Sequence, residues 1–269
     1  MLRLKKITLL EVTMRIENIR LITSLISTFK RQSDSESDAI SCVICRGCRF
    51  EQHKVLPNEL IEQWNLSPEE VHYIDRQQGY KCCSCGANLR SLTLAGAIMS
   101  HIGGEYHSFK EFCDQSQTAH EQNLLEINEA GNLTPYLSAF RHYSLGRYPD
   151  VDMQRLQYPD NTFDIIVHSD TLEHMPQPIL ALQECRRVIR KGGFVAFTVP
   201  IVYGRLNASR EGLVPSYHLG STSLEEREGY RVYTEYGADF WVQVMKAGFT
   251  RIELSTIDGP GCIAVIAIK

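Results

Sequence analysis

Residues 163–200 read FDIIVHSDTLEHMPQPILALQECRRVIRKGGFVAFTVP, and this stretch decides the fold. Its apolar run Ile165–Val167 ends in the polar cluster His168–Asp170, a pattern typical of a buried parallel strand that opens onto a crevice. Phe194–Val199 is rich in aromatic and β-branched residues and predicts a second strand. The crossover between two such parallel strands should be right-handed. We expect the functional site at the carboxyl ends of the strands, where open α/β sheets bind their ligands.

A helix is predicted between the two strands. Pro178 suits a first helical turn, and apolar residues recur at threes and fours from there to Ile189. Arg190–Lys191 suit the negative C-terminal end of a helix, and Gly192–Gly193 should stop it. The whole stretch therefore predicts one strand–helix–strand unit.

The order of residues in this unit resembles a known family. The pattern consists of Asp164, Leu172–His174, Arg187–Ile189, Lys191–Gly193 and Pro200. It resembles class I S-adenosylmethionine (SAM)-dependent methyltransferases of the branch with a Leu-Glu-His turn. The resemblance implies a Rossmann-like α/β fold with a mostly parallel sheet and a final antiparallel strand, with SAM as the cofactor. The alternative is an ordinary doubly wound unit that binds another ligand, because a fold alone does not fix function.

The composition limits the remaining classes. A chain of 269 residues is long enough for one sizeable domain with a small appendage. With 28 basic and 32 acidic residues it is nearly neutral, which does not favour nucleic-acid binding. Six of the nine cysteines lie between residues 42 and 85. This clustering favours a metal site over disulfides and indicates a reducing, cytoplasmic location.

Residues 1–40 are predicted to stand apart from the rest. Apolar and charged side chains alternate at the start, which indicates an amphipathic helix that packs on the body or a partner, with membrane-surface association as the alternative. The longest uncharged run, Leu21–Phe29, is too short for a membrane span, and Glu11 and Arg15 interrupt the apolar core that a secretory signal needs. Residues 31–38 are polar and acidic and predict a linker.

The cysteines of residues 41–90 predict a zinc-ribbon-like module. Cys42 and Cys45 form one Cys-x-x-Cys knuckle, and Cys82 and Cys85 form a second. Two knuckles can offer four thiolates to one tetrahedral zinc ion, and Gly86 suits the tight turn after the second. A closed four-sulfur site has no open position for a substrate, so the expected role of the zinc is folding rather than catalysis.

Two further thiols leave the ligand set open. Cys48 could replace Cys45, Cys83 could replace Cys82, or both could be ordinary buried residues. Between the knuckles, Ser67 precedes a proline and two glutamates, which predicts an N-capped helix inside the zinc loop, with a mere spacer as the alternative.

Residues 91–269 are predicted to form the methyltransferase-like domain. A helix is expected at Leu89–Ile102, and the first strand at Asn123–Ile127. The resemblance, which extends over about residues 42–269 and includes methyltransferases with an N-terminal zinc ribbon, implies a Glu/Asp-x-Gly-x-Gly turn after that strand. Glu126 matches the acid and Gly131 a later glycine, while Asn128 stands where the first glycine is expected. Asparagine tolerates the left-handed conformation, so the turn can persist and contact the cofactor.

Other positions match the cofactor site less completely. The second strand, predicted at His142–Leu145, has no acid at its end to hold the ribose. The short distance from the first strand to Asp164 predicts that a helix and a strand are trimmed or lost. By resemblance, Asp152 and Met153 should lie beside the adenine and Ser169 should also contact the cofactor, with an ordinary loop carboxylate as the alternative for Asp152.

The crevice after the 163–169 strand supplies candidate catalytic groups. Methyl transfer needs orientation and, for a protonated acceptor, a base, and His168, Asp170 or His174 could be that base. For His174 a structural role at the turn is the stronger alternative. The spacing of these histidines and acids is no standard metal-ligand pattern.

The C-terminal part contains a long polar excursion. Residues 200–233 are interpreted as a substrate lid, with a disordered crossover as the alternative. Thr234 should cap a helix that ends at Gly248 and packs through Phe240, Trp241, Val244 and Met245. Residues 249–254 and 262–268 should form the closing antiparallel strands.

The sequence therefore predicts a SAM-dependent methyltransferase with a structural zinc and an unidentified small-molecule or macromolecular acceptor. The alternative is a methyltransferase fold that has lost its cofactor and serves as a zinc-stabilised interaction or nucleic-acid-binding module. Nucleic acid remains open as a less favoured partner, because the module is locally basic. Its basic residues are Arg46, Arg49, Lys54, Lys81 and Arg90.

Overall fold

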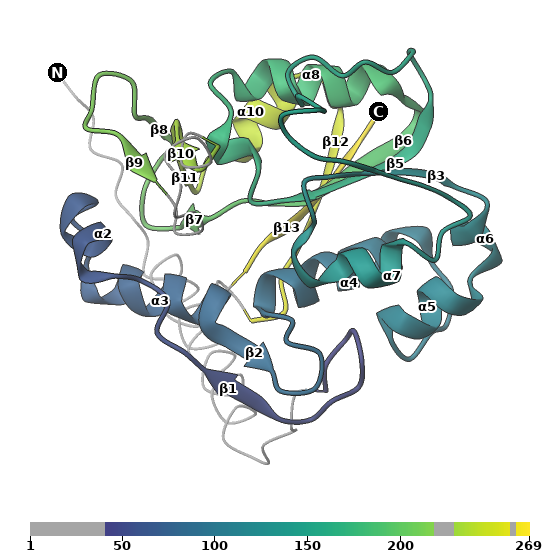
Figure 1. The fold of residues 1–269 in the computed structure, drawn as a ribbon, viewed down its shortest axis with the longest axis horizontal. Helices are drawn as coiled ribbons and strands as arrows, with labels where there is room; N and C mark the ends of the chain where they lie inside the picture. The colour runs from purple at the N-terminus through teal and green to yellow at the C-terminus, as the bar shows by residue number, and fades with distance from the viewer. Residues whose placement is uncertain (1–40, 218–228, 259–261) are drawn as a thin grey trace, which may run out of the picture. The chain divides into compact units, whose positions relative to one another are not determined.

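The computed structural model describes residues 41–217, 229–258 and 262–269, and residues 41–269 form one compact unit (Figure 1). The amphipathic helix and linker predicted in residues 1–40, and the middle of the predicted lid, lie outside the described residues. Within the described ranges, no helix combines the length and apolar character needed to cross a membrane.

A six-stranded sheet forms the centre of the fold, in the order β12-β13-β6-β5-β3-β4. β3, β4, β5 and β6 pair in parallel, whereas β13 is antiparallel to both of its neighbours. The bounds are β3 Asn123–Ile127, β4 His142–Gly146, β5 Phe163–Ser169, β6 Ile189–Thr198, β12 Arg251–Ser255 and β13 Ala264–Ile268. The Rossmann-like sheet with closing antiparallel strands is confirmed.

The predicted shortening lies between β4 and β5. β4 itself is present, and its partner β3 has the predicted bounds. In residues 147–162, all of them described, the chain passes from β4 to β5 without a further helix or strand. A crossover element is therefore lost at this point, and a loop that carries Asp152 takes its place.

Helices cover both faces of the sheet, as Figure 1 shows. One face packs against α4 (Leu89–Ile102), α5 (Phe109–Gln115) and α7 (Thr134–Leu137), and the other against α8 (Pro178–Val188) and α10 (Trp241–Lys246). In β5, Ile165 and Val167 contribute to the first core and Ile166 to the second. The uninterrupted apolar run of β5 follows from burial on both faces.

Local signals set several helix ends. α4 has the predicted bounds, because the side chain of Asn88 accepts the Ser91 amide at 3.0 Å and Gly103 follows the last turn. α3 (Pro68–Gly79) starts at a capping box in which Ser67 and Glu70 satisfy each other's backbone amides. The helix predicted inside the cysteine loop is thus present, preceded by the short α2 (Asn58–Gln63). Two still shorter helical segments are α6 (Gln117–His120) and η1 (Gly131–Leu133).

The predicted end of α8 is wrong. The helix stops at Val188, and the next residues begin β6, where Ile189 pairs with Phe163 of β5. Sheet pairing with β5 buries Ile189 completely and satisfies its backbone in the ladder. Gly193 lies inside the strand, where an added Cβ would meet the carbonyl oxygen of Asp164 at 2.5 Å. This glycine therefore permits close strand approach rather than helix termination.

The helix predicted from Thr234 is also misplaced. Thr234–Gly237 forms β11, which pairs with β7 (Ile201–Val202) and β8 (Ala208–Ser209). α10 begins only at Trp241, whose side chain is exposed, as is that of Met245. The pairing partners lie far back in the sequence, so the local capping signal at Thr234 was overridden. The closing strands β12 and β13 occur as predicted.

The cysteine-rich segment shares its core with the sheet domain. β1 (Phe50–Gln52) pairs antiparallel with β2 (Tyr80–Cys82), and α2 and α3 lie between them in sequence. The buried side chains of Cys42 and Ile44 belong to the same apolar cluster as Leu124 of β3. The boundary predicted at residue 90 lies within α4 and stays a prediction.

Candidate functional site

The turn after β3 lies at the carboxyl edge of the sheet. Asn128 has φ = +57° and Gly131 has φ = +59°. The Asn128 amide donates to the carbonyl oxygen of Gly146 at 2.8 Å, and its side-chain oxygen accepts the Tyr148 amide at 2.9 Å. Asn128 therefore adopts the predicted left-handed conformation and joins the ends of β3 and β4.

Two observations favour glycine at position 131. Its φ is one that residues with a Cβ rarely adopt. An added Cβ would lie 2.6 Å from Oγ of Ser91, because the turn packs directly against α4. A larger residue here would therefore require the Ser91 side chain to shift as well as an unfavourable φ.

Glu126 is placed differently from its predicted role. Its carboxylate is fully buried and accepts hydrogen bonds of 2.6 Å from the Ala130 amide, the Thr134 hydroxyl and the Tyr143 hydroxyl. Burial, together with the adjacent Glu126 carboxylate, raises the pKa of Tyr143 and keeps its proton on the hydroxyl. Because three protein groups donate hydrogen bonds to its carboxylate, Glu126 stabilises the conformation of the turn from inside the protein.

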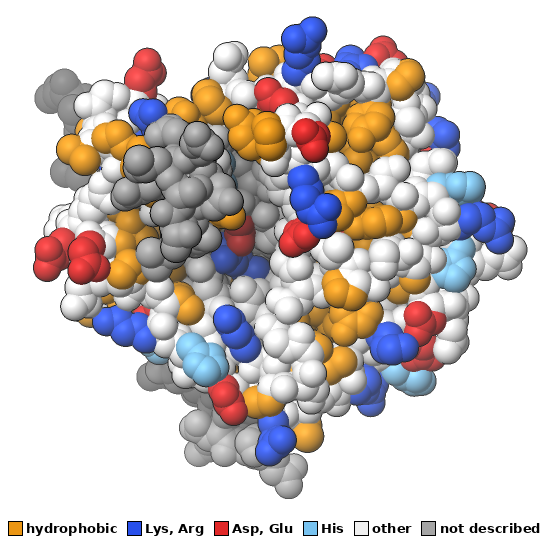
Figure 2. All heavy atoms as spheres, in the orientation of Figure 1, with side chains coloured by type: hydrophobic (Ala, Val, Ile, Leu, Met, Phe, Trp, Pro, Cys, Tyr) orange, Lys and Arg blue, Asp and Glu red, His pale blue; other side chains and the backbone are white. Residues whose placement is uncertain are grey.

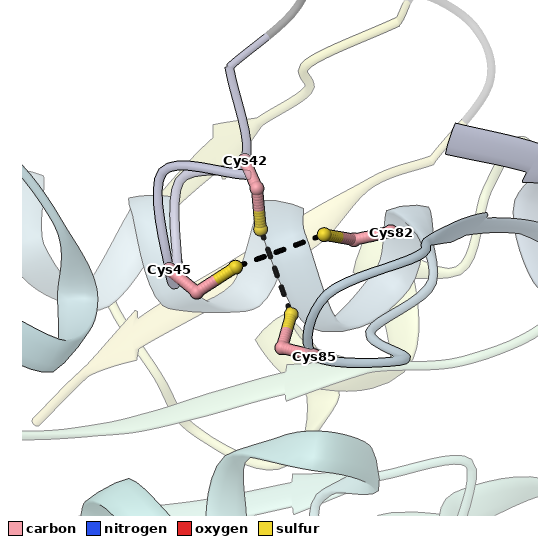
Figure 3. Close-up of side chains that lie close together, drawn as sticks. All are labelled: Cys42, Cys45, Cys82 and Cys85. Carbon is pink, nitrogen blue, oxygen red and sulfur yellow. Dashed lines mark hydrogen bonds between the residues drawn. The ribbon is translucent and has the colours of Figure 1, made fainter. Parts of the chain in front are cut away.

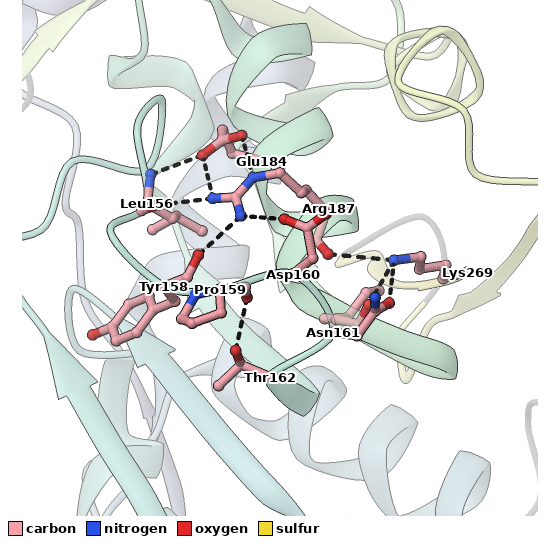
Figure 4. Close-up of polar contacts among 10 residues, drawn as sticks. Leu156, Tyr158, Pro159, Asp160, Asn161, Thr162, Glu184, Arg187 and Lys269 are labelled. Atoms are coloured by element: carbon pink, nitrogen blue, oxygen red, sulfur yellow. Dashed lines mark hydrogen bonds and ion pairs between the residues drawn. The ribbon is translucent and has the colours of Figure 1, made fainter.

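Asp152 and Met153 lie in the loop that replaces the missing crossover. Oδ1 of Asp152 accepts the Gln154 amide at 2.8 Å, whereas Met153 is only 1% exposed and belongs to the α8-side core. Arg187 of α8 fastens this loop by donating to the carbonyl oxygens of Leu156 and Tyr158 at 2.8 and 2.9 Å (Figure 4). It also contacts carboxylate oxygens of Glu184 and Asp160 at 2.8 Å. Sequence reasoning used Arg187 only as part of a pattern and missed this positioning role.

Asp170 ends β5 in a strained conformation, with φ = +49°. Its Oδ1 lies 2.5 Å from Nη1 of Arg90, which is only 6% exposed. Burial raises the pKa of Asp170, and Arg90 opposes that rise. Arg90 was one of the residues expected to make the cysteine-rich module locally basic, but its charge is buried and paired with Asp170. The preceding Ser169 shares a hydrogen bond of 2.7 Å with the Thr198 hydroxyl.

The two candidate histidines differ sharply. His168 is completely buried, stacks on Phe197 at 4.9 Å between ring centroids, and has no hydrogen-bond partner at either nitrogen among the residues that the structure describes. Burial lowers its pKa to about 3, so the ring is neutral and out of reach of an acceptor. The structure does not support His168 as the base. Nδ1 of His174 lies 2.9 Å from the carbonyl oxygen of Arg231, and since a carbonyl only accepts, that nitrogen carries the hydrogen.

Asp170, His174 and Arg90 line one pocket at the carboxyl ends of β5 and β6. The rest of its wall comes from residues 55–78, between the knuckles, and from residues after β6. Figure 2 shows a hollow on this face beside the grey atoms, with basic and acidic side chains inside it. Two of the three predicted catalytic residues therefore meet at a cavity, and the third does not.

The four predicted zinc ligands converge (Figure 3). The sulfurs of Cys42, Cys45, Cys82 and Cys85 all lie within 4.8 Å of one another, and the Cys42–Cys85 and Cys45–Cys82 distances are both 3.7 Å. A tetrahedral zinc with bonds of about 2.3 Å requires sulfurs about 3.8 Å apart, so the donor set fits that ion.

Backbone geometry supports the same assignment. Although burial opposes it, hydrogen bonds from the backbone amides of Cys85 and Ser84 lower the pKa of Cys82 to about 7, whereas burial raises the pKa values of Cys42 and Cys85. The positions after the knuckles, Arg46 and Gly86, both have positive φ, at 67° and 74°. Cys48 and Cys83 are exposed and lie outside the cluster of four.

Comparison with known proteins supports this architecture. Residues 129–197 match the family described as a methyltransferase domain. This match includes the end of the Asn128–Gly131 turn, β4, the Asp152 loop, β5, α8 and most of β6. Over these residues the chain therefore matches a methyltransferase domain.

Curated relatives agree with the assignment of a methyltransferase domain. The ubiquinone/menaquinone biosynthesis C-methyltransferase UbiE of Bdellovibrio bacteriovorus is 26% identical over 125 residues, 42% of this chain and 52% of that protein. Methyltransferase GfsG of Streptomyces halstedii is 31% identical over 108 residues, 39% of this chain and 35% of that protein. The chain thus spans about half or less of these relatives' length. A solved SAM-dependent methyltransferase from Aquifex aeolicus aligns at 16% identity with a TM-score of 0.36, covering 66% of this chain and 90% of that one.

The methyltransferase domain also contains an acid that sequence reasoning missed. No acidic residue ends β4, but Glu129 of the preceding turn reaches that end and pairs with Arg147 at 2.6 Å. Both side chains are exposed. Because the two residues are 18 positions apart, only the parallel pairing of β3 with β4 brings this carboxylate to the place where the ribose acid was expected.

Proposed function

We propose that the methyltransferase domain binds SAM and transfers its methyl group to an acceptor held at the Asp170 pocket. One observation carries the proposal: the left-handed Asn128–Gly131 turn and the β5 end at Ser169–Asp170 lie on adjacent strands at the carboxyl edge. The chain leaves β3 for β4 on one side and returns to β5 on the other. Such a switch point is where open α/β sheets bind their ligands.

The predicted cofactor residues divide into contacts and supports. The backbone of Asn128 and Gly131 would approach SAM. Asp152 would accept a hydrogen bond from the adenine amino group, and Glu129 would accept hydrogen bonds from the ribose hydroxyls. Met153 would cover the ring from the core side, and Ser169 would face the methionine part. Glu126 and Arg187 would act indirectly, since their polar atoms hold the turn and the Asp152 loop.

Bound SAM would supply a methyl group activated by a sulfonium. The chain's own contribution is orientation, because an in-line displacement depends chiefly on how the reacting atoms are held. Arg90 holds the Asp170 carboxylate, and the Arg231 carbonyl fixes the tautomer of His174. Both pocket-lining groups are therefore placed before any acceptor arrives.

We also propose that Cys42, Cys45, Cys82 and Cys85 bind one structural zinc ion. All four positions of a tetrahedral ion would be filled by sulfur, which leaves none for chemistry. The cluster lies at the base of the segment that forms part of the pocket wall. Zinc would therefore support the site by fixing both ends of that segment.

The test is calorimetric titration of the zinc-loaded protein with SAM and with its product, S-adenosylhomocysteine. Asp152→Ala should weaken both affinities about tenfold, the loss of one good hydrogen bond. Asp150→Ala, an exposed carboxylate two residues away, is the matched control and should bind as the wild type does. Absence of binding by folded protein at millimolar ligand would refute the proposal and leave the zinc-stabilised interaction module as the better reading.

A further inference from the structure

The pocket beside Asp170 has mainly apolar walls. The segment between the knuckles, residues 53–79, contributes Leu56, Leu60, Leu66 and Ile74, and Val202 follows β6. Four of these five side chains are buried in one small cluster together with Tyr73, and the partly buried Leu60 packs against that cluster. The cavity holds about 260 Å³, slightly below the range of about 300–1,000 Å³ common for small-molecule sites.

The inter-knuckle segment (residues 53–79) is fixed at its base. The amide of His53 donates to the Gly79 carbonyl at 3.0 Å, and β1 and β2 continue that pairing toward the cysteine cluster. Oδ1 of Asp75 accepts the amides of Val55 and Leu56 at 2.8 and 2.9 Å. The first residues of the segment are therefore hydrogen-bonded to α3, the helix that forms the last part of the segment.

The same segment is tied to the chain after β6. Arg205 donates to both carboxylate oxygens of Glu70, at 2.5 and 2.6 Å, and to the Trp64 carbonyl at 2.9 Å. These bonds to Arg205 lower the pKa of Glu70 and keep the pair ionised. The rings of Tyr73 and Tyr203 meet edge to face at 4.7 Å. Two sequence regions more than a hundred residues apart thus form one continuous wall.

At the closed end of the pocket the charges of Arg90 and Asp170 are paired, and burial raises the pKa of the neighbouring Glu173 carboxyl, which lies 3.6 Å from Nε2 of His174. The Arg90 guanidinium and the Asp170 carboxylate are in direct contact, so neither offers an unpaired charge. Burial lowers the pKa of His174, which keeps that ring neutral near pH 7. A charged acceptor would lose its hydration here without gaining an opposite charge, whereas an uncharged one would not.

We propose that this pocket is the acceptor site, and that it takes an uncharged, largely apolar small molecule whose hydroxyl lies between Asp170 and His174, with the inter-knuckle segment selecting it. This inference rests on the proposed function. In the reaction the acceptor oxygen forms a bond to the methyl carbon, the carbon–sulfur bond breaks with its electron pair passing to sulfur, and the hydroxyl proton is released to water. The products are a methyl ether and S-adenosylhomocysteine.

The test uses 2-naphthol, a neutral apolar hydroxyl compound, and 2-naphthoate, its anionic counterpart, in equilibrium dialysis with the zinc-loaded full chain. We expect saturable binding of 2-naphthol at one site, and binding of 2-naphthoate about tenfold or more weaker. Leu60→Trp should fill the cavity and weaken 2-naphthol binding by about tenfold or more. Glu59→Trp adds the same indole at an exposed neighbouring position and should leave binding within about twofold of wild type.

A parallel titration with S-adenosylhomocysteine separates this inference from the proposed function. Its affinity should be the same in the wild type and both tryptophan variants. Retained S-adenosylhomocysteine binding without 2-naphthol binding, a preference for 2-naphthoate, or unchanged 2-naphthol binding in Leu60→Trp would each overturn the acceptor assignment alone. If S-adenosylhomocysteine fails to bind the wild type, the proposed function falls and the acceptor assignment falls with it.

Discussion

The cysteine cluster and the turn after β3 are both loops with left-handed residues, yet they use their motif residues in different ways. All four cysteines point toward one another, and every predicted ligand has its predicted place. At the turn, Asn128 and Gly131 adopt the predicted conformation, whereas the Glu126 carboxylate points into the protein. When the residues of a motif bind one shared metal ion, their spacing in the sequence predicts where their side chains point. At the end of a strand, the direction of a side chain also depends on the residues that pack beneath it.

The largest expected effect comes from breaking the cluster. Cys85→Ser should abolish zinc binding and lower the free energy of unfolding by about 5 kcal/mol or more, because metal binding at such a site is coupled to folding. Zinc content by mass spectrometry and urea unfolding measure the two effects. Cys83→Ser, at an exposed thiol two residues away, is the matched control and should retain the metal. Equal zinc loss in both variants would contradict the assigned ligand set.

At the turn, the corresponding change should destabilise without affecting zinc. Glu126→Gln replaces an acceptor-only carboxylate that receives three hydrogen bonds, and it should cost about 3 kcal/mol. Urea unfolding should show the loss, while zinc content stays that of the wild type. Glu121→Gln, at an exposed carboxylate, should change stability by less than about 0.5 kcal/mol. A stable Glu126→Gln protein with weakened SAM binding would instead indicate direct contact with the cofactor.

The pH dependence of stability tests whether His168, like Glu126, points into the protein interior. Its folded-state pKa of about 3 lies below the ordinary value of 6.5, so between these limits the unfolded chain binds the extra proton. Stability should therefore fall as pH decreases from 6.5, by at most about 1.4 kcal/mol per pH unit from this residue. His168→Leu should reduce that slope in urea unfolding at pH 7, 6 and 5, and His142→Leu, at an exposed site, should not. Identical slopes in wild type and His168→Leu would show that the ring is not buried neutral.

The smallest effects come from comparing a glycine of the cysteine cluster with a glycine of the helix α4. Gly86 has φ = +74° but open space around it, with the nearest atom to an added Cβ at 3.5 Å, so Gly86→Ala should cost about 1 kcal/mol from conformation alone. Gly96 lies in α4, where an added Cβ would make an ordinary contact with Val43 at 3.9 Å. Gly96→Ala should stabilise by about 0.5–1 kcal/mol through helix propensity. Thermal unfolding should show shifts of opposite sign, and shifts of the same sign would refute the conformational argument.

The sequence by itself determined the features that depend on neighbours along the chain. The spacing of cysteines, the Ser67 capping box, the bounds of α4 and β3 and the apolar run of β5 all follow from local periodicity and local hydrogen bonding. The mostly parallel sheet with closing antiparallel strands was implied by the resemblance of residues 163–200 to class I methyltransferases, and the structure has it.

Only the tertiary structure decided where side chains at the strand ends point and which distant segments pair. It directed Glu126 and His168 into the interior, paired Arg90 with Asp170, drew Ile189 and Thr234 into strands, and brought the inter-knuckle segment to the pocket. The physical reason is the same in each case. Burial and hydrogen bonding with residues distant in sequence outweigh local preferences that are worth only about 1 kcal/mol per residue.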